Sequence, residues 1–479
     1  MTHVLVVGGG IGGLATALLA ARYGHTVELF EGDPRAPGAD PAGALDREAL
    51  DRAFFGRHRP AVPQATQPHA LLGAARTVLR AELPDVYARM LELGARERHD
   101  LDWFDERPPA RPGDEDLVTV QARRIVLESA LGAAVRAEPG ITAHHGERVR
   151  GLVAVRDRAG APPRVTGVRT ASGSREGELT VAAGGRRGDV ERWLADAGCR
   201  PPLVERHRTG LAYLCRWYRL PEGLSDGPRR PWAVAGGRFA GCAVFPADNG
   251  TFAVTLFVHT TDPTRAALRD PAVFEAAART FPPAAAWLDI GARPLSDVIA
   301  TAALDNRWSA LADGHGPVVT GLVPVGDAIT HTNPTLGQGV SLALWAARRV
   351  ATTAHEEPRS VGFAAGYQAW ARATLRPWFD FQVVADAALD QRFGIGALGG
   401  TAAPAAAPRE TAALFECALT DPVVMRARAR VRHLAETPAR AYADPDVKAR
   451  VARWLADRPD YVPNTAGPDR ATWEKLATG

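Results

Sequence analysis

A glycine-rich stretch near the start of the chain constrains the fold more than any other feature. The stretch runs from Gly8 to Gly13 and follows a continuous apolar run, Val4 to Val7. A helical pattern from Gly10 to Tyr23 and a second apolar run from Thr26 to Phe30 come after it. This order predicts a strand, a helix and a second strand parallel to the first. The chain therefore opens with one βαβ unit.

The glycines of this unit form a G-x-G-x-x-G pattern between the first strand and the helix. Unpaired backbone N–H groups and the positive end of the helix dipole attract a pyrophosphate there, and side chains would hinder its approach. We therefore expect a dinucleotide site, the alternative being a structural turn rich in glycine. The residues expected to contact the dinucleotide are Gly8, Gly10, Ile11, Gly12 and Gly13.

Glu31 follows the second strand directly. Its carboxylate can accept hydrogen bonds from an adenosine ribose, and it would repel a 2′-phosphate. The site is therefore expected to take FAD or NAD rather than NADP.

The middle of the chain alternates between helical and β-like patterns. Gly32 to Pro68 has no clear periodicity and predicts a long loop. Two helices are expected next, and then three β-like runs with the spacing of an antiparallel meander. The helices are expected at Leu71 to Leu93 and Arg123 to Arg136, and the runs at Gly151 to Val155, Arg164 to Thr170 and Glu178 to Ala183.

A separate antiparallel sheet is expected between Glu205 and Asn306. Its strands would include Thr209 to Leu220 and a hairpin that turns at Asp248-Asn249-Gly250 between Cys242 to Phe245 and Phe252 to Val258. The strand Gly321 to Val325 and the helix Gly337 to Ala354 return to the α/β pattern of the opening unit. The remainder is helical in character, apart from Gly399 to Pro408, which has the composition of a linker or a lid.

Composition narrows the function. The net charge of +3 is small for 479 residues and is not gathered into basic blocks, so nucleic acid is not an expected partner. The four cysteines are far apart, which indicates neither a disulfide framework nor a metal site and favours a cytoplasmic protein. No stretch has the length and hydropathy of a membrane span, so no membrane association is expected.

A second motif lies far along the chain, at Gly326-Asp327-Ala328. A strand that ends in Gly-Asp places a carboxylate at the edge where α/β sheets bind ligands. Pro334, Leu336, Gly337, Gln338 and Gly339 follow, and they start a helix whose N–H groups can face a flavin ring.

Together with the opening motif and with Arg124, these residues resemble the class A flavoprotein monooxygenases, the group typified by para-hydroxybenzoate hydroxylase. The resemblance runs in order from residue 4 to about 350. It implies that Asp327 binds the ribityl chain of FAD, that the backbone of 336–339 contacts the isoalloxazine ring, and that Arg124 helps to hold the cofactor. The alternatives are a turn-capping role for Asp327 and a surface ion pair for Arg124.

The implied fold is α/β, with a discontinuous FAD-binding Rossmann domain of the glutathione-reductase type, an antiparallel-sheet substrate domain and a helical C-terminal part. The domains would comprise 1–75, 117–200 and 307–355 for FAD, 76–116 and 201–306 for the substrate, and 356–479 for the helical region. The implied activity is insertion of one oxygen atom from O2 into an organic substrate, by epoxidation or hydroxylation through a C4a-hydroperoxyflavin. A setting in specialised metabolism, such as antibiotic biosynthesis, also follows from the resemblance alone.

Two positions depart from the family pattern. Gly184 stands where aromatic hydroxylases usually have an Asp shared between flavin and NADPH, and Thr330 stands where they often have a His. Asn333-Pro334 with Gly337-Gln338-Gly339, and Pro63-Gln64 through His69-Ala70-Leu71-Leu72, look more like the squalene, polyether and styrene epoxidases. Electrons are therefore expected from NAD(P)H, either directly or through a partner flavin reductase.

Aromatic residues of the second sheet and of the late helix are candidates for the substrate pocket, although a core position is at least as common for each. Phe252 and Phe257 would face opposite sides of a regular strand, so at most one should reach the pocket. The candidates are Tyr213, Trp217, Phe245, Phe252, Phe257 and Trp345.

No catalytic residue is assigned from the sequence, because a phenol substrate would need a general base whereas an alkene would not. The candidate bases are His207, Tyr218, Asp305 and His331. A flavin-dependent halogenase is not favoured, because the chain has no Trp-x-Trp-x-Ile-Pro motif and no Lys before Lys448. An FAD-dependent prenyl or alkene reductase and a non-catalytic flavin-binding protein stay open as alternatives.

Overall fold

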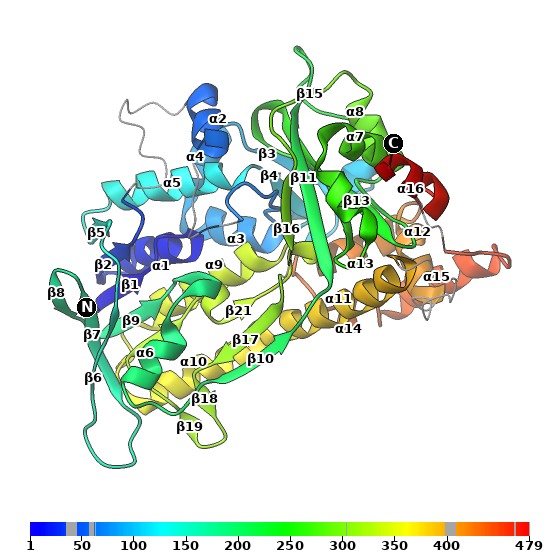
Figure 1. The fold of residues 1–479 in the computed structure, drawn as a ribbon. Helices are drawn as coiled ribbons and strands as arrows, with labels where there is room; N and C mark the ends of the chain where they lie inside the picture. The colour runs from blue at the N-terminus through cyan, green and yellow to red at the C-terminus, as the bar shows by residue number, and fades with distance from the viewer. Residues whose placement is uncertain are drawn as a thin grey trace.

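The computed structural model describes residues 1–34, 46–56, 62, 64–302, 304–397, 409–463 and 466–478. Pro63 and the Gly399 to Pro408 stretch lie outside the described residues. The chain forms a mixed α/β fold with a parallel sheet at one end, an antiparallel sheet at the other, and a layer of C-terminal helices below them (Figure 1).

The parallel sheet takes strands from widely separated stretches of the chain, so the Rossmann unit is discontinuous as expected. Its order is β20-β9-β1-β2-β5, and all neighbours run parallel. The strands are β20 (Leu322–Pro324), β9 (Leu179–Ala182), β1 (His3–Val7), β2 (Thr26–Glu31) and β5 (Ile141–His145).

Alternate side chains of β1 enter two different cores. Val4 and Val6 pack with helices α1 (Ile11–Arg22), α5 (Arg124–Ala137) and α9 (Gly339–Thr353) on one face. Leu5 and Val7 pack on the other face, because successive side chains of a strand point to opposite sides. That second face is covered by β6 (Gly151–Val155), β7 (Arg164–Thr170) and α6 (Val190–Asp196), and β8 (Gly173–Glu176) pairs with β7 at the edge of the small sheet.

The prediction for the third strand of the meander was wrong. That strand is β8, whereas the expected run Glu178 to Ala183 supplies β9 of the parallel sheet. All four residues of β9 are buried, which suits a central parallel strand covered on both faces. Most residues of β8 are exposed, as an edge strand allows.

Two further predictions were wrong about helices: one missed a break between two helices, and the other missed a helix. The single helix expected from Leu71 to Leu93 is two helices, α3 (Gly73–Glu82) and α4 (Pro84–Glu92). Pro84 has no N–H to continue α3 and instead begins α4. The stretch expected to be a loop from Gly32 to Pro68 contains α2 (Arg47–Gly56) among its described residues. The short hairpin β3 (Arg96–His99) and β4 (Val118–Gln121) lies between α4 and α5.

The predicted antiparallel sheet is present and has the order β12-β13-β14-β11-β15, with β16 also paired to β11. The hairpin between β13 and β14 turns at 248–250, where Asn249 and Gly250 have positive φ as tight hairpins require. The strands are β11 (Leu211–Arg219), β12 (Val234–Gly236), β13 (Ala240–Pro246), β14 (Thr251–His259), β15 (Arg293–Pro294) and β16 (Ile299–Ala302).

Helices α7 (Pro271–Arg279), α8 (Pro282–Leu288) and α16 (Arg470–Thr478) cover one face of this sheet (Figure 1). Trp473 of α16 is fully buried, and its Nε1 donates to Oγ1 of Thr264 at 2.8 Å. Arg470 binds Asp262 at 2.6 Å. The last helix thus completes a core whose other members lie some two hundred residues earlier.

A third sheet and the C-terminal helices connect the two ends of the molecule. The sheet has the order β10-β17-β21, and α11 (Arg376–Ala397) packs on both β17 and β14. Its strands are β10 (Leu203–His207), β17 (Asn306–Ala310) and β21 (Thr330–His331), and β18 (Ala312–Asp313) and β19 (Gly316–Pro317) form a small hairpin beyond it. The other helices are α10 (Val361–Thr374), α12 (Arg409–Ala418), α13 (Pro422–Arg432), α14 (Pro438–Ala441) and α15 (Pro445–Ala456). Across the described ranges, none of the helices combines the length and apolar character needed to cross a bilayer.

Candidate functional site

One cavity of about 2400 Å³ runs from the parallel sheet to the antiparallel sheet and the C-terminal helices. Typical small-molecule sites measure roughly 300–1,000 Å³, so this cavity has room for a dinucleotide and a second molecule. Glu31 and Asp327, which come from opposite ends of the sequence, both line it. The cavity has two compartments: the dinucleotide end, beside the glycine-rich turn, and the far end, beside the C-terminal helices.

The glycine-rich turn borders the dinucleotide end and depends on two close backbone contacts. Gly8 has φ +113°, and a Cβ there would lie 2.5 Å from the carbonyl oxygen of Ala183. A Cβ on Gly13 would lie 1.8 Å from the carbonyl oxygen of Gly8, so Gly13 packs the helix against the strand and does not line the cavity. Gly10 faces the open cavity. One side of the turn is therefore packed against backbone, and the other side is open to the cavity.

Helix α1 starts in this turn without a side-chain cap and without an acidic residue in its first turn. Its first backbone N–H groups therefore lack helical partners and attract an anion. Arg124 at the start of α5 lines the same part of the cavity. A Cβ on Gly10 would lie 3.9 Å from Nη2 of Arg124, so positive charge and free N–H groups meet at one point. This donor set fits a diphosphate.

Glu31 is held in place by two backbone groups. Its Oε2 accepts a hydrogen bond from the N–H of Gly9 at 2.6 Å, and its Oε1 accepts one from the N–H of Asp33 at 2.7 Å. Both oxygens keep further lone pairs for a ligand, since a carboxylate can accept about four hydrogen bonds. A ribose at the end of β2 fits this carboxylate.

His69 contacts Arg124 directly at the cavity wall and helps to fix its orientation. Nδ1 of His69 lies 2.9 Å from the carbonyl oxygen of Gln67, so Nδ1 carries the proton and Nε2 accepts from Nη1 of Arg124 at 3.4 Å. Burial and the nearby Arg124 charge lower the pKa of His69 to about 4. On its other side Arg124 donates to Glu128 at 2.9 Å. The guanidinium is thus fixed between a neutral imidazole and a carboxylate.

The second motif brings Asp327 and the start of α9 to the cavity. Asp327 lies in the single turn Gly326–Ala328 that follows β20. Gly337 has φ +68°, a left-handed conformation that favours glycine and reverses the chain into α9. Gln338 precedes α9 without a side-chain cap, and nothing lies within 4 Å of a Cβ on Gly339. Pro334, Leu336, Gly337, Gln338 and Gly339 all line the cavity.

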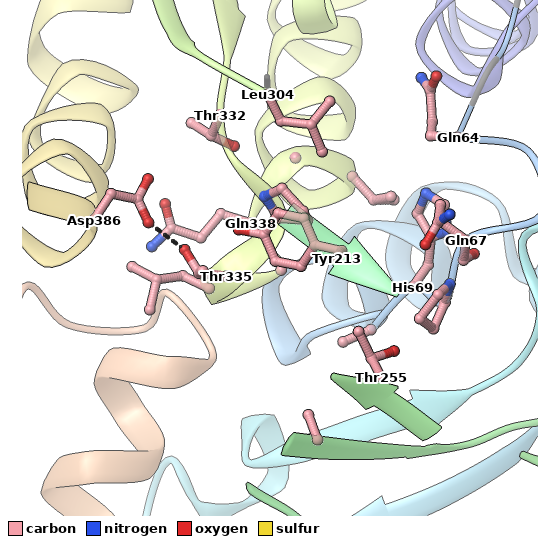
Figure 2. A pocket seen from close by; sticks show the side chains of 18 of the residues that line it. Gln64, Gln67, His69, Tyr213, Thr255, Leu304, Thr332, Thr335, Gln338 and Asp386 are labelled. Atoms are coloured by element: carbon pink, nitrogen blue, oxygen red, sulfur yellow. Dashed lines mark hydrogen bonds between the residues drawn. The ribbon is translucent and has the colours of Figure 1, made fainter. Parts of the chain in front are cut away.

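Several residues that line the cavity carry a buried polar atom without a hydrogen-bond partner among the described residues, and two of these atoms belong to glutamines near the start of α9 and near His69. They are Oε1 of Gln338 and Nε2 of Gln67. Figure 2 shows Gln338 on the side of Thr335 and Asp386, and Gln67 beside His69 on the opposite side. Because buried polar groups are normally hydrogen-bonded, an acceptor and a donor left open here suit a polar, planar ligand such as a flavin ring.

A buried polar cluster behind Asn333 holds the loop that leads to α9. Asp386 of α11 accepts hydrogen bonds from Nδ2 of Asn306 at 2.7 Å and from Nδ2 of Asn333 at 3.0 Å. It also accepts one from Oγ1 of Thr335 at 2.5 Å (Figure 2). Tyr213 donates its hydroxyl to Oδ1 of Asn333 at 2.7 Å. Burial, with a smaller contribution from Asp386, raises the pKa of Tyr213 well above its ordinary value. The loop is therefore fixed from three elements, β11, β17 and α11.

Three of the six aromatic candidates line the cavity: Tyr213, Phe245 and Phe257. Phe252 points to the other face of β14 and stacks on Tyr218, so only one of the Phe252 and Phe257 pair reaches the cavity, as the strand geometry predicts. Trp217 lies outside because its ring packs on Phe54 and its Nε1 donates to the carbonyl oxygen of Thr66 at 2.8 Å. Trp345 packs against the core beneath α9 instead.

Of the candidate bases, only His331 lines this cavity. Its Nδ1 lies 2.7 Å from the carbonyl oxygen of Asp305, and its Nε2 has no hydrogen-bond partner among the described residues. His207 packs against Phe379 on an open surface, and Tyr218 is buried beside Glu275. Asp305 lies in a separate small surface pocket with Arg186 and Arg187.

The sequence did not single out Gln67, Asp386 or the role of His69. His69 stood within a motif that carried the family resemblance, but no pattern indicated its contact with Arg124. Asp386 lies in a long helix where acidic residues are common, and only the fold brings it beside Asn333. Gly184, where an Asp was expected, borders the cavity with Gly185 and Arg186.

Comparisons with known proteins agree with this geometry. Residues 6–50 match the model of an NAD(P)-binding Rossmann-like domain. Protein Rv3254 of Mycobacterium tuberculosis is 26% identical over 359 residues, which cover 71% of this chain and 70% of that protein.

Among solved structures, the fold is similar to that of PqsL, a probable FAD-dependent monooxygenase from Pseudomonas aeruginosa, with a TM-score of 0.57, 20% identity, and coverage of 83% of this chain and 100% of that one. It is also similar to the flavin-dependent brominase Bmp2, with a TM-score of 0.55, 14% identity, and coverage of 99% and 98%. OxyS, an anhydrotetracycline hydroxylase from Streptomyces rimosus, has a TM-score of 0.53, 16% identity, and coverage of 90% and 76%. The chain therefore has the fold seen in FAD-dependent monooxygenases. At these identities the likeness concerns the fold alone.

Proposed function

We propose that the chain is an FAD-dependent monooxygenase that inserts one oxygen atom from O2 into a small organic molecule. The observation that carries the proposal is the single cavity in which Glu31, the start of α1, Arg124, Asp327 and the start of α9 meet. The first three suit an adenosine diphosphate, and the last two lie farther along the same cavity.

Each part of FAD has a matching group. Glu31 would bind the adenosine ribose, and Gly10, Ile11 and Arg124 the diphosphate. Asp327 would bind the ribityl chain, and the backbone at 336–339 the ring. The domain division expected from the sequence belongs to the same proposal, with the FAD domain assembled from 1–75, 117–200 and 307–355.

When bound and reduced, FAD would supply the activation of O2. One oxygen atom enters the substrate, the other leaves as water, and NAD(P)H supplies two electrons. The residues of the protein would orient the flavin and the substrate and would enclose them. The Asp386 cluster fixes the loop before α9. The rings of Tyr213, Phe245 and Phe257 line the same cavity and would help to keep water away from the reacting atoms.

The route of the electrons is part of the proposal. With Gly184 in place of a carboxylate, we propose that a partner flavin reductase delivers them, direct reduction by NAD(P)H being the alternative. We propose an alkene substrate, and hence epoxidation, because Asn333-Pro334 and Gly337-Gln338-Gly339 resemble the motifs of the epoxidases. An alkene would also need no general base on the protein. A place in specialised metabolism is proposed on the same resemblance.

The test starts with the purified chain and FAD. We expect one FAD per chain, slow bleaching of the flavin by NADPH or NADH alone, and rapid bleaching with an added flavin reductase, followed by O2 uptake. A chain that retains no FAD contradicts the proposal.

The same experiment separates the alternatives. Fast bleaching by NADPH alone would establish the direct route. Reduction of an alkene such as geranylgeraniol in the absence of air would identify a prenyl reductase. Reoxidation in air without oxygenation of styrene or 2-naphthol under ¹⁸O2 would favour a non-catalytic flavin-binding protein.

A further inference from the structure

The far end of the cavity is lined by arginines and aromatic rings rather than by the groups that suit FAD. It lies between β12, the end of α11, and helices α12, α13 and α15. Arg428 of α13 and Arg392 of α11 line it, together with Trp232, Phe415 and Trp454. No part of the proposed FAD site uses these residues.

Arg428 is held by rings and not by a carboxylate. Its guanidinium carbon lies 4.4 Å from the centroid of the Trp232 ring and 5.1 Å from that of Phe415. Neither a hydrogen bond nor an ion pair joins its side chain to any residue in the described ranges. Burial lowers the pKa of Arg428 to about 10. Its N–H groups are therefore open to the cavity while its ring contacts fix its position.

Arg392 is a second cation in the same condition. It is half-buried, its Nε has no partner among the described residues, and burial lowers its pKa. The Arg392 side chain lies against Gly236 of β12, since a Cβ on that glycine would be 3.1 Å from Nη2. The guanidinium is thus placed at the cavity wall.

The nearby acids are already engaged. Asp100 binds Arg432 and His433, and Glu416 accepts from the hydroxyl of Tyr461 at 3.0 Å. The stretches 398–408 and 464–465, which adjoin this region in sequence, contain no Asp or Glu. The charge of Asp100 also acts on Arg428, but no carboxylate among the described residues forms an ion pair with Arg428 or Arg392. A partly buried cation without such a pair is unfavourable, so each of these arginines favours an added anion.

We propose that the far end of the cavity binds the carboxylate of an organic acid through Arg428, with the apolar body of the acid directed along the cavity. The planar fork of an arginine matches a carboxylate with two parallel hydrogen bonds. Ile395, Leu419 and Val462 supply apolar wall for the rest of the molecule. This inference rests on the proposed function, in which that acid is the oxygen acceptor.

The experiment compares 2-naphthoate with 2-naphthamide, which have the same shape and differ in charge. Binding of each to the full chain is measured by calorimetry, after addition of FAD. We expect the acid to bind at least about tenfold more tightly than the amide. Equal binding of the two, or binding of neither, would overturn the proposal, and both outcomes are independent of any variant.

Variants assign the effect to residues. We expect Arg428→Gln to reduce the preference for the acid to about threefold or less, Arg428→Lys to retain part of it because the charge remains, and Arg392→Gln to leave most of it. Arg453→Gln removes an exposed charge outside the cavity and should leave the preference intact. A preference that survives Arg428→Gln, or that falls equally in Arg453→Gln, contradicts the assignment.

A separate titration keeps this result apart from the proposed function. FAD binding is followed by quenching of flavin fluorescence in each variant, and we expect it to be unchanged, because Arg428 and Arg392 lie at the end of the cavity away from Glu31. A wild-type chain that binds no FAD but prefers the acid would contradict the monooxygenase proposal and still support the carboxylate site.

Discussion

At the scale of single residues, the proposed selection of the dinucleotide depends on Glu31. Its two carboxylate oxygens accept hydrogen bonds from the backbone N–H groups of Gly9 and Asp33, which fix its orientation. In the proposed complex this negative charge would face the ribose, so the contact would depend on charge as well as on shape.

We expect Glu31→Gln to weaken FAD binding about tenfold, because a hydrogen bond to a charged acceptor is worth roughly 1.5–3 kcal/mol and the amide keeps part of it. Quenching of flavin fluorescence measures the dissociation constant. Glu28→Gln on the same strand is the matched control, since Glu28 binds His144 and does not line the cavity. A Glu31→Gln protein with unchanged affinity would remove the ribose assignment.

His69 gives a second prediction, in the pH dependence of stability. Its pKa is lowered to about 4 in the folded chain and is about 6.5 when unfolded, so the unfolded state binds more protons between these values. Stability from the neutral imidazole is complete above pH 6.5 and is lost as the pH falls toward 4, by at most about 1.4 kcal/mol per pH unit.

Replacement of His69 by Leu removes this titration. Urea unfolding at pH 7.0 and pH 5.0 measures it, and we expect the variant to lose less stability over that interval than the wild type. Other buried histidines, such as His25 and His433, titrate equally in both proteins and cancel in the difference. The same loss in both proteins would show that His69 does not titrate as described.

The limits of sequence reasoning are clearest at this scale. Glu31, Arg124 and Asp327 belong to motifs with fixed spacing, and their common place at one cavity could be predicted because the motif itself defines the geometry. Arg428, Arg392 and Asp386 are ordinary helical residues, and their importance depends on which neighbours the fold supplies. An unpaired arginine cannot be recognised until every carboxylate around it has been placed.

At the scale of elements, the loop before α9 is the part whose position matters most. It carries Pro334 to Gly337 from β21 into the helix, and Asp386 binds it through Asn333 and Thr335. An acidic side chain of α11 thus sets where the N-terminus of α9 points, although it lies behind the cavity wall.

We expect Asp386→Asn to lower the free energy of unfolding by about 1–3 kcal/mol, because the amide turns one acceptor into a donor facing other donors. The flavin absorption spectrum should also shift, since the start of α9 moves relative to the ring. Asp380→Asn, on the same helix but exposed and paired with Arg376, is the control for stability and spectrum. An unchanged spectrum in a destabilised Asp386→Asn protein would reduce Asp386 to a purely structural role.

Sequence patterns predicted elements well where local chemistry determines them. The opening βαβ unit, the 248–250 hairpin and the strand at Gly321 to Val325 all form near their expected places. The run at Glu178 to Ala183 was placed in the wrong sheet, because a short apolar run fits an antiparallel meander as well as a central parallel strand. Only pairing with β1 and β20 distinguishes the two.

At the scale of the whole molecule, FAD would connect segments that are more than three hundred residues apart. Residues 8–13 and 336–339 border one cavity, and a ligand that contacts both stabilises only the state in which both are folded.

We therefore expect FAD at a hundred times its dissociation constant to stabilise the fold by about 2.7 kcal/mol and to raise the melting temperature by at least about 3 °C. Scanning calorimetry measures the shift. Flavin mononucleotide lacks the adenosine part and should bind more weakly, so at the same concentration it should give a clearly smaller rise. Equal shifts with the two flavins at equal concentration would mean that the glycine-rich turn and Glu31 take no part in binding.

The position of α16 has a consequence for how the protein is made. The indole of Trp473 packs against Phe239 and Phe281 and completes the core on that side of the antiparallel sheet. This side of the sheet therefore stays uncovered until residues 470–478 have left the ribosome. The core that covers the parallel sheet also uses residues of α10 and α11, but none of its members among the described residues comes after Leu434. During synthesis, the nucleotide-facing half can thus reach its native packing while the other half is still exposed to chaperones.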